Sequence, residues 1–186
     1  IYLEASDAVL LDEQSILLSD LEYETAPPRP SERAGNIHVV AGSLTLLDGA
    51  RIRSDVFLAD QGGNIRVDVV GAVLLSGASP SLDATQTGIA KSGLLARSAQ
   101  GSHLGQSFTQ PGATAGRIEV TAGSLEISNG AVLSAATVET PADAGSIAVA
   151  VEGLLRLTGQ WENSASEIGA RGGSGEPGSV ILHAGR

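Results

Sequence analysis

The sequence contains no cysteine and no methionine, and only five of its 186 residues are aromatic. The absence of cysteine excludes a disulfide framework, cysteine-ligated zinc and a thiol nucleophile. Because a complete translation product begins with methionine, we expect the chain to be a processed form or an interior segment of a longer protein. With so few aromatic side chains, its hydrophobic core has to be built from Val, Ile, Leu and Ala.

Positive charge is also scarce, since 11 Lys and Arg face 21 Asp and Glu, for a formal net charge of −10. Nucleic acids and anionic lipids are bound through Lys and Arg, so the composition predicts neither as a partner. No run approaches the roughly 20 apolar residues of a membrane helix, and the chain does not start like a signal peptide. We therefore expect no membrane insertion.

What the sequence does contain is an internal repeat. A motif of a small residue, glycine, any residue and an aliphatic residue opens five segments, whose glycines are Gly35, Gly63, Gly116, Gly145 and Gly178. Residues 37–55 and 118–136 share Ala-Gly-Ser-Leu followed by an Asx-Gly turn, whereas 65–77 and 147–159 share a different pattern. Gly35 and Gly116 are 81 residues apart and Gly63 and Gly145 are 82 apart, so a unit of two modules recurs.

Within each module apolar and polar residues alternate with period two, which is typical of β-strands. In the first module we expect strands at 37–41, 43–47 and 51–54. One such module cannot bury its apolar face alone, but stacked copies form a continuous core. The sequence therefore predicts an all-β parallel β-helix of about five coils with three short strands per coil. The alternative is a β-sandwich or antiparallel barrel, which also has short strands but does not repeat at this length.

In a β-helix, equivalent residues of stacked coils form columns. The predicted buried columns are Ile37, Ile65, Ile118, Ile147 and Val180; Leu46, Leu75, Ile127 and Leu157; and Ile52, Leu95, Leu133 and Ile168. We expect one β-helical segment over 1–186, with coils at 35–62, 63–115, 116–144 and 145–177, a partial coil with a Pro-rich loop at 1–34 and the start of another coil at 178–186. Asn36 and Asn64 are expected to hydrogen-bond along the stack as a short ladder.

The coil at 63–115 is longer than the others, and its extra length falls in two loops, at about 77–91 and 98–115. Insertions in repeat proteins lie on the surface and often at a binding face. The candidate contact residues in these loops and around the single tryptophan are Gln100, His103, Gln106, Phe108, Trp161, Glu162 and Glu167.

We identify no catalytic motif, no cofactor-binding motif and no metal-ligand spacing in the sequence. Trp161 near Glu162 and Glu167 suggests a different class of function, a polysaccharide-degrading hydrolase or lyase, because a ring face and two carboxylates suit glycoside hydrolysis. Four aspartates could also approach one another across coils, where they would mark solvated turns or weak Ca²⁺ contacts: Asp48, Asp55, Asp60 and Asp68.

The module openings resemble a known family. Gly-Asn-Ile (35–37 and 63–65) followed by Ala-Gly-Ser-Leu-x-Leu-x-Asx-Gly-Ala (41–50) is similar to the repeats of filamentous-haemagglutinin-like exoproteins of two-partner secretion systems, some of which carry S-layer family labels. The resemblance covers about 35–186 and implies a right-handed parallel β-helix, a dedicated outer-membrane transporter and no catalytic residues. It predicts a non-catalytic stalk segment of a large secreted adhesin on the bacterial cell surface, with host or surface glycans or proteins as partners.

Overall fold

The structure is a computed structural model that describes residues 1–19, 33–57, 61–80, 89–99, 102–103, 106–107, 114–138 and 142–185. Every regular element in these ranges is a β-strand, so the described part of the chain is all-β, as the sequence predicted. Within the same ranges no segment forms a helix able to cross a membrane.

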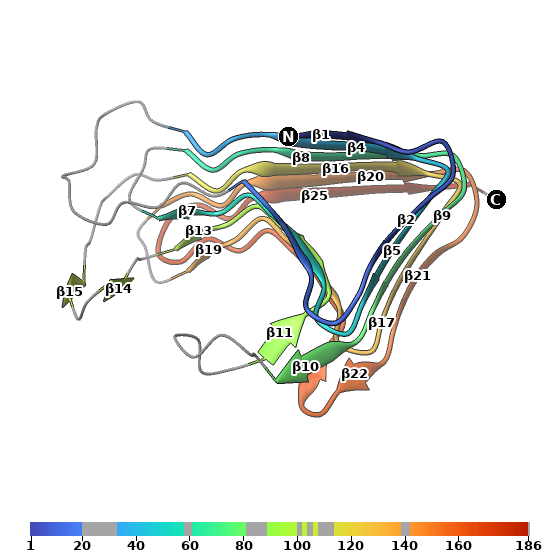
Figure 1. The fold of residues 1–186 in the computed structure, drawn as a ribbon. Helices are drawn as coiled ribbons and strands as arrows, with labels where there is room; N and C mark the ends of the chain where they lie inside the picture. The colour runs from blue at the N-terminus through green and yellow to red at the C-terminus, as the bar shows by residue number, and fades with distance from the viewer. Residues whose placement is uncertain are drawn as a thin grey trace.

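Six parallel strands form the first sheet, sheet A, which is the upper layer in Figure 1. In spatial order they are β1 (Tyr2–Glu4), β4 (Ile37–Ala41), β8 (Ile65–Val69), β16 (Arg117–Ala122), β20 (Ser146–Val151) and β25 (Ser179–Ala184). Strands β4, β8, β16, β20 and β25 begin at or next to the aliphatic residue of the repeat motif. Each strand therefore pairs with the strand of the next module, and the sequence repeat is also the spatial repeat.

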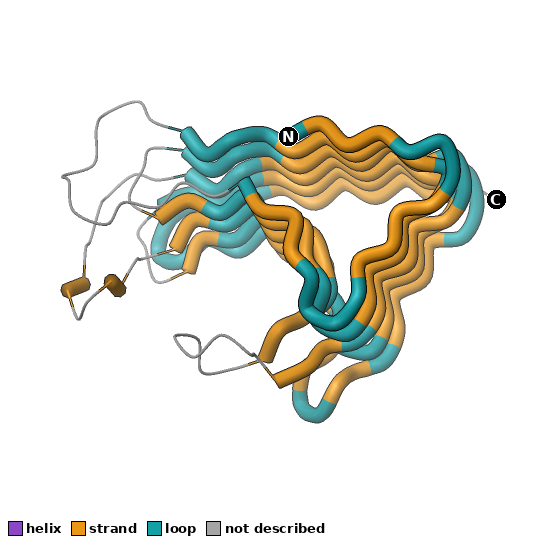
Figure 2. The backbone as a smooth tube through the Cα atoms, in the orientation of Figure 1, coloured by secondary structure: helices purple, strands orange, loops and turns teal. Residues whose placement is uncertain are grey.

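Two further parallel sheets follow along the chain. Sheet B contains β2 (Ala8–Leu11), β5 (Ser43–Leu47), β9 (Ala72–Ser76), β17 (Ser124–Ser128) and β21 (Leu155–Thr158). Sheet C contains β3 (Ile16–Leu18), β6 (Arg51–Arg53), β12 (Gly93–Leu95), β18 (Val132–Ser134) and β24 (Glu167–Gly169). The chain passes through sheets A, B and C in the same order each time, and the three sheets form three walls around a common interior (Figure 2).

A fourth parallel sheet, sheet D, was not predicted. It pairs β7 (Val56–Phe57), β13 (Ser98–Ala99) and β19 (Thr137–Val138), so the expectation of three strands per coil is wrong for three of the coils. Val56 is fully buried there and packs with Ala34 in a small cluster apart from the main core. The register partners of Val56 in the next two coils, Ser98 and Thr137, are buried as well.

Three antiparallel hairpins interrupt the parallel arrangement. They pair β10 (Ala78–Pro80) with β11 (Ile89–Lys91), β14 (Ser102–His103) with β15 (Gln106–Ser107), and β22 (Gln160–Trp161) with β23 (Ser164–Ala165). The first and second hairpins fall in the two loops predicted as insertions, and the third, like the first, lies between a strand of sheet B and a strand of sheet C. Sheets A to D are parallel throughout. The alternative prediction of a β-sandwich or an antiparallel barrel is therefore wrong for the described residues.

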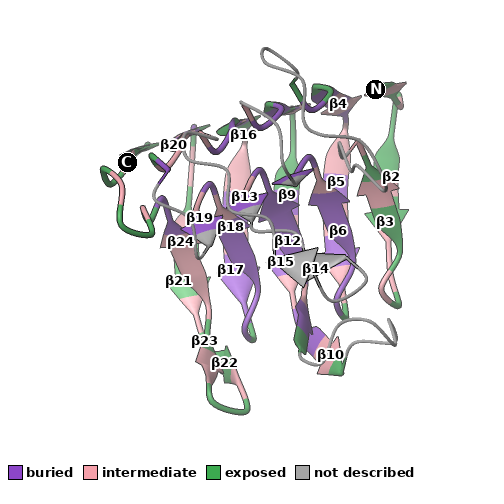
Figure 3. Cartoon of the chain, turned by 90° about the vertical axis from the view of Figure 1, so that its left-hand side faces the viewer, coloured by how far each residue is buried: buried purple, intermediate pink, exposed green. Residues whose placement is uncertain are grey.

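The interior between the three walls is packed with Ile, Val, Leu and Ala side chains. Ile37 pairs in register with Ile65, Ile65 with Ile118 and Ile118 with Ile147, and all four are at most 1% exposed. Leu46, Leu75 and Ile127 form a second file in sheet B, each fully buried. Burial is deepest in the central coils, whereas strands β2 and β3 are partly exposed (Figure 3).

Three of the predicted column positions differ in the structure. Val180 pairs with Ile147 and Leu157 with Ile127, but they are 41% and 44% exposed, because β25 and β21 are the outermost strands of their sheets. Leu95 is not in the third column, where its neighbour Leu94 pairs with Ile52 and Leu133. Two adjacent leucines point to opposite faces of a strand, and the alternating pattern alone does not show which one faces inward.

The repeated glycines lie at the corner that leads into sheet A, where successive coils approach closely. A Cβ atom on Gly63 would overlap the carbonyl oxygen of Gly35, and one on Gly116 or Gly145 would overlap that of the glycine one coil before. The Asn ladder is confirmed beside them. Asn36 Oδ1 accepts the backbone N–H of Asn64 at 2.9 Å, and Asn64 Oδ1 accepts that of Arg117 at 3.0 Å.

The Asx-Gly turns form the corner between sheets B and C. Asp48 and Gly49 have φ values of 48° and 89°, and Asn129 and Gly130 have 54° and 86°. The backbone N–H of Ala50 donates to the Leu47 carbonyl at 2.9 Å, and that of Ala131 to the Ser128 carbonyl at 3.1 Å. Two successive residues at positive φ favour Asn or Asp followed by Gly, which explains the shared dipeptide.

Candidate functional site

The structure describes only some of the contact residues predicted in the loops. Gln100 and Phe108 lie outside the described residues. His103 and Gln106 are register partners at the end of the β14–β15 hairpin, and only their backbone is described.

Trp161, Glu162 and Glu167 lie in two different surroundings. Trp161 ends β22 and packs partly buried against Gly130, while Glu162 is exposed in the two-residue turn before β23, at a φ of 49°. Glu167 lies in β24 of sheet C, where its Oε1 accepts from Arg171 Nη2 at 3.0 Å. The two carboxylates that suggested glycoside hydrolysis therefore belong to different elements, a hairpin turn and a sheet.

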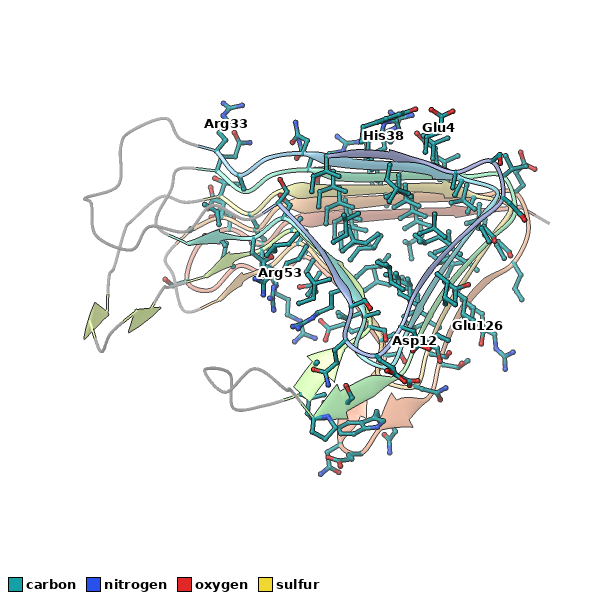
Figure 4. All side chains as sticks on the ribbon, in the orientation of Figure 1. Glu4, Asp12, Arg33, His38, Arg53 and Glu126 are labelled. Carbon is teal, nitrogen blue, oxygen red and sulfur yellow. The ribbon has the colours of Figure 1, made fainter. Side chains whose placement is uncertain are left out.

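The outer face of sheet C holds the most distinctive arrangement of charge. A cavity of about 280 Å³ lies over this face, next to the β10–β11 hairpin, and we call it the sheet C groove. Its basic lining side chains are Arg51, Lys91 and Arg97, and its apolar ones are Ile89, Leu95 and Val132. Ser134 and Glu167 complete the lining. Arg53, two residues from Arg51 on β6, also points outward from this wall (Figure 4).

Strand geometry explains why these side chains share one face. Side chains alternate across a strand, so Arg51 and Arg53 face outward while Ile52 between them is fully buried in the core. Leu95 is the register partner of Arg53 and Ser134 the partner of Leu95, so they occupy the same outer face in the next two coils. Lys91 reaches this face from β11, just before the chain enters β12.

A buried carboxylate, Asp55, organises the basic side chains at the edge of the groove. It is 0% exposed and follows β6, and its Oδ1 accepts the backbone N–H of Arg97 at 2.8 Å. Its Oδ2 accepts from Arg97 Nη2 at 2.7 Å and lies 3.8 Å from Arg53 Nε. Asp55 thus joins two successive coils and fixes the Arg97 side chain, since a carboxylate held by several donors has little rotational freedom.

The outer face of sheet A carries a different, balanced charge pattern. Asp68 Oδ2 lies 2.7 Å from His38 Nε2 and accepts from Arg66 Nε at 2.7 Å, and Glu119 Oε1 accepts from Arg117 Nη2 at 2.6 Å. The hydrogen bond from Arg66 is the largest effect and lowers the pKa of Asp68 below its ordinary value; burial opposes it, and the hydrogen bond from His38 lowers the pKa further. Within these pairs the acids and bases neutralise one another.

A hollow of about 520 Å³ follows the glycine corner. It is lined by Gly116, Gly145 and Gly178 with Asn64, Arg117 and small residues. This trough exists because glycines have no side chains, and Arg117 is its one charged lining residue. Within the described residues no group of three or more His, Cys, Asp or Glu could hold a metal ion.

The basic residues of the sheet C groove were not among the predicted sites. One signal was present, because the Ala-Arg pairs at 96–97 and 170–171 end equivalent segments of two modules. Arg51, Lys91 and Arg97 are otherwise separated by up to 46 residues and scattered in an acidic chain. Only the stacking of coils brings them together.

Comparison with protein-family models, with curated proteins and with solved structures finds no match to this chain.

Proposed function

We propose that this chain is a stretch of right-handed parallel β-helix that serves as a non-catalytic stalk in a large exoprotein, similar to filamentous haemagglutinins, on the bacterial cell surface. The observation that carries the proposal is the in-register parallel pairing of successive modules in sheets A, B and C. Right-handedness follows from the general rule that connections between parallel strands of one sheet are right-handed.

A stacked core of this kind suits a mechanical spacer. Each added module lengthens the molecule by one inter-strand spacing, roughly 4.8 Å, and buries its apolar face against the previous module. The core files of Ile and Leu run through consecutive coils, so the main core is continuous along the stack. Such an element holds whatever it carries at a fixed distance from its anchor.

Location outside the cell is supported by the motif resemblance and by composition. A chain without cysteine forms no disulfide before export, and its net charge of −10 favours solubility. A dedicated outer-membrane transporter is the export partner that the resemblance implies. The alternative of a polysaccharide-degrading enzyme stays a hypothesis, and the separate surroundings of Glu162 and Glu167 do not favour it.

The β-helix predicts a specific disulfide. Thr121 and Ala150 are register partners on the outer face of sheet A, and both are exposed. The Cα atoms of such partners lie about 4.8 Å apart, within disulfide range, so the Thr121→Cys/Ala150→Cys variant should oxidise to one intramolecular cross-link, measured by gel mobility and mass. In the matched control, Thr121→Cys/Ala148→Cys, the partners are displaced by two residues, about 8 Å apart, and should not link. Equal cross-linking of both pairs would contradict the register.

A cysteine at position 121 also tests whether this segment lies outside the cell. We expect the single variant Thr121→Cys, expressed in the parent protein in its own cells, to react with a membrane-impermeant maleimide on intact cells. Thr121 is exposed on sheet A, and the described chain has no native thiol to compete. The core variant Val120→Cys is the control, because Val120 is 1% exposed and should not be labelled. Labelling of Thr121→Cys only after the cells are broken would place the segment inside and overturn the proposal.

A further inference from the structure

We propose that the corner between sheets B and C in alternate coils is a display position, a place where the fold carries an exposed hairpin whose length can change without disturbing the stack. The two positions are those of the β10–β11 and β22–β23 hairpins. The proposal goes beyond the stalk role and does not depend on where the protein is located. It rests on one arrangement of hydrogen bonds that occurs twice among the described residues.

A serine closes the base of the first hairpin and joins it to the preceding coil. Ser92 directly follows β11 and is 0% exposed. Its N–H donates to the Gly77 carbonyl at 3.0 Å and its Oγ to the Ser76 carbonyl at 2.7 Å, so it holds the two ends of the hairpin together. The same Oγ accepts the backbone N–H of Gly49, in the Asx-Gly turn of the preceding coil, at 2.9 Å. We call this serine with its three hydrogen bonds the serine clip.

The second hairpin has the same serine clip. Ser166 directly follows β23, and its N–H donates to the Gly159 carbonyl at 3.1 Å. Its Oγ donates to the Thr158 carbonyl at 2.8 Å and accepts the backbone N–H of Gly130 at 3.0 Å. Gly130 again belongs to the Asx-Gly turn of the preceding coil. The serine clip therefore recurs two coils later with the same three hydrogen bonds.

Serine alternates with alanine at this position of the stack. From β6 to β24, the residue before each strand of sheet C is Ala50, Ser92, Ala131 and Ser166 in turn. The alanines belong to the coils in which an Asx-Gly turn joins sheets B and C directly, and the serines to the coils with a hairpin. In the turn coils a backbone hydrogen bond closes the corner, such as that from Ala50 N–H to the Leu47 carbonyl at 2.9 Å. A hydroxyl is thus present where a hairpin has to be closed.

Each hairpin also packs closely against the turn of the preceding coil. A Cβ atom on Gly49 would lie 3.0 Å from the carbonyl oxygen of Ala90, and one on Gly130 would lie 2.8 Å from the Cβ of Trp161. A turn module and the hairpin module that follows it therefore form one structural pair. This pairing agrees with the two-module repeat of the sequence.

The same base accommodates hairpins of different length. Residues 78–91 lie between Gly77 and Ser92, but only residues 160–165 lie between Gly159 and Ser166. Corresponding distances in the two clips nevertheless differ by only 0.1 Å. Because the clip closes the base, added residues lengthen only the loop beyond it, and closing a longer loop costs little extra entropy. Insertions in repeat proteins lie on the surface and often carry the binding function.

Insertion of a short epitope peptide between Glu162 and Asn163, which are both exposed in the turn of the second hairpin, tests the display position. We expect the midpoint of thermal unfolding, followed by circular dichroism, to change by less than about 3 °C. An antibody against the epitope should bind the folded chain. The matched control places the same peptide between Asp48 and Gly49, at the same corner of a turn coil, where the midpoint should fall by more than about 10 °C. Equal losses at the two sites, or failure of the hairpin insertion to fold, would overturn the proposal.

The serine clip itself is tested by Ser166→Ala, with Ser164→Ala in the same hairpin as the matched control. Loss of the Ser166 hydroxyl removes the acceptor of the Gly130 N–H. Hydrogen exchange of that amide, measured by NMR, should therefore quicken about tenfold, the usual effect of one lost hydrogen bond. Ser164→Ala leaves the clip intact and should not change this rate. An unchanged rate in Ser166→Ala, or the same increase in both variants, would overturn the role of the serine. Neither experiment depends on the maleimide result that tests the stalk.

Discussion

Replacing Gly116 with alanine is expected to lower the free energy of unfolding by about 3 kcal/mol, the upper end of the usual cost of overpacking. The new Cβ would overlap the carbonyl oxygen of Gly63 in the preceding coil. That oxygen cannot move aside at low energetic cost, because it belongs to the backbone and not to a flexible side chain. The backbone of Gly116 is itself held by its N–H bond to the Ala96 carbonyl at 3.0 Å, so relief requires the two coils to separate.

The matched control is Gly153→Ala, at a corner between sheets A and B. A Cβ there would lie 3.1 Å from the carbonyl oxygen of Gly123, with no other atom close. Neither glycine has a positive φ, so both substitutions gain the same stabilisation from a less flexible unfolded chain, about 0.4–1 kcal/mol. We expect Gly153→Ala to change stability by less than about 1 kcal/mol. Urea unfolding followed by circular dichroism measures both, and equal midpoints would contradict the close approach of the coils at Gly116.

Replacing Asp55 with alanine is expected to lower the free energy of unfolding by about 3 kcal/mol, because it removes a fully buried carboxylate from an ion pair whose arginine, Arg97, is 30% exposed. Asp55 is 0% exposed, and it accepts both the backbone N–H and the guanidinium of Arg97. The substitution leaves that N–H and the nearby Arg53 guanidinium without their carboxylate. Since Asp55 and Arg97 belong to successive coils, we also expect the loss to loosen the edge of the sheet C groove.

Asp68→Ala is the control for this second prediction. Asp68 also contacts an arginine at 2.7 Å, but its side chain is 28% exposed and that of Arg66 is 56% exposed. Surface ion pairs contribute at most about 1 kcal/mol, so the control should lose much less stability than Asp55→Ala. Chemical denaturation at neutral pH compares the two variants. If the two variants lose the same small amount of unfolding free energy, burial does not strengthen the contribution of Asp55, and the prediction is contradicted.

Much of the arrangement was predictable from the repeat. Strands at 37–41 and 43–47 are confirmed as β4 and β5, and the Ile37–Ile65 and Ile118–Ile147 pairings follow from equal distances to the repeated glycine. The reason is that an in-register stack places the same position of each module in the same wall. A pattern of alternating residues therefore specifies both the strand and its neighbour.

The candidate site was not predictable in this way. Lys91 lies in a hairpin that has no counterpart in the first module, so the repeat assigns it no position. Leu94 and Leu95 are chemically alike, and only the pairing of Leu94 with Ile52 shows which one enters the core. The sequence suggests a solvated turn or a weak Ca²⁺ contact at Asp55, but its side chain is fully buried and paired with Arg97 of the next coil.

By itself the sequence determined the period of the repeat, the glycine corners, the Asx-Gly turns and the all-β character, since these depend on local geometry and on the spacing of like residues. The tertiary structure alone decided which charges meet. Arg51, Lys91 and Arg97 share a groove because stacking turns distances along the chain into one inter-strand spacing. No local pattern encodes that contact, because Arg51 lies in one coil while Lys91 and Arg97 lie in the next.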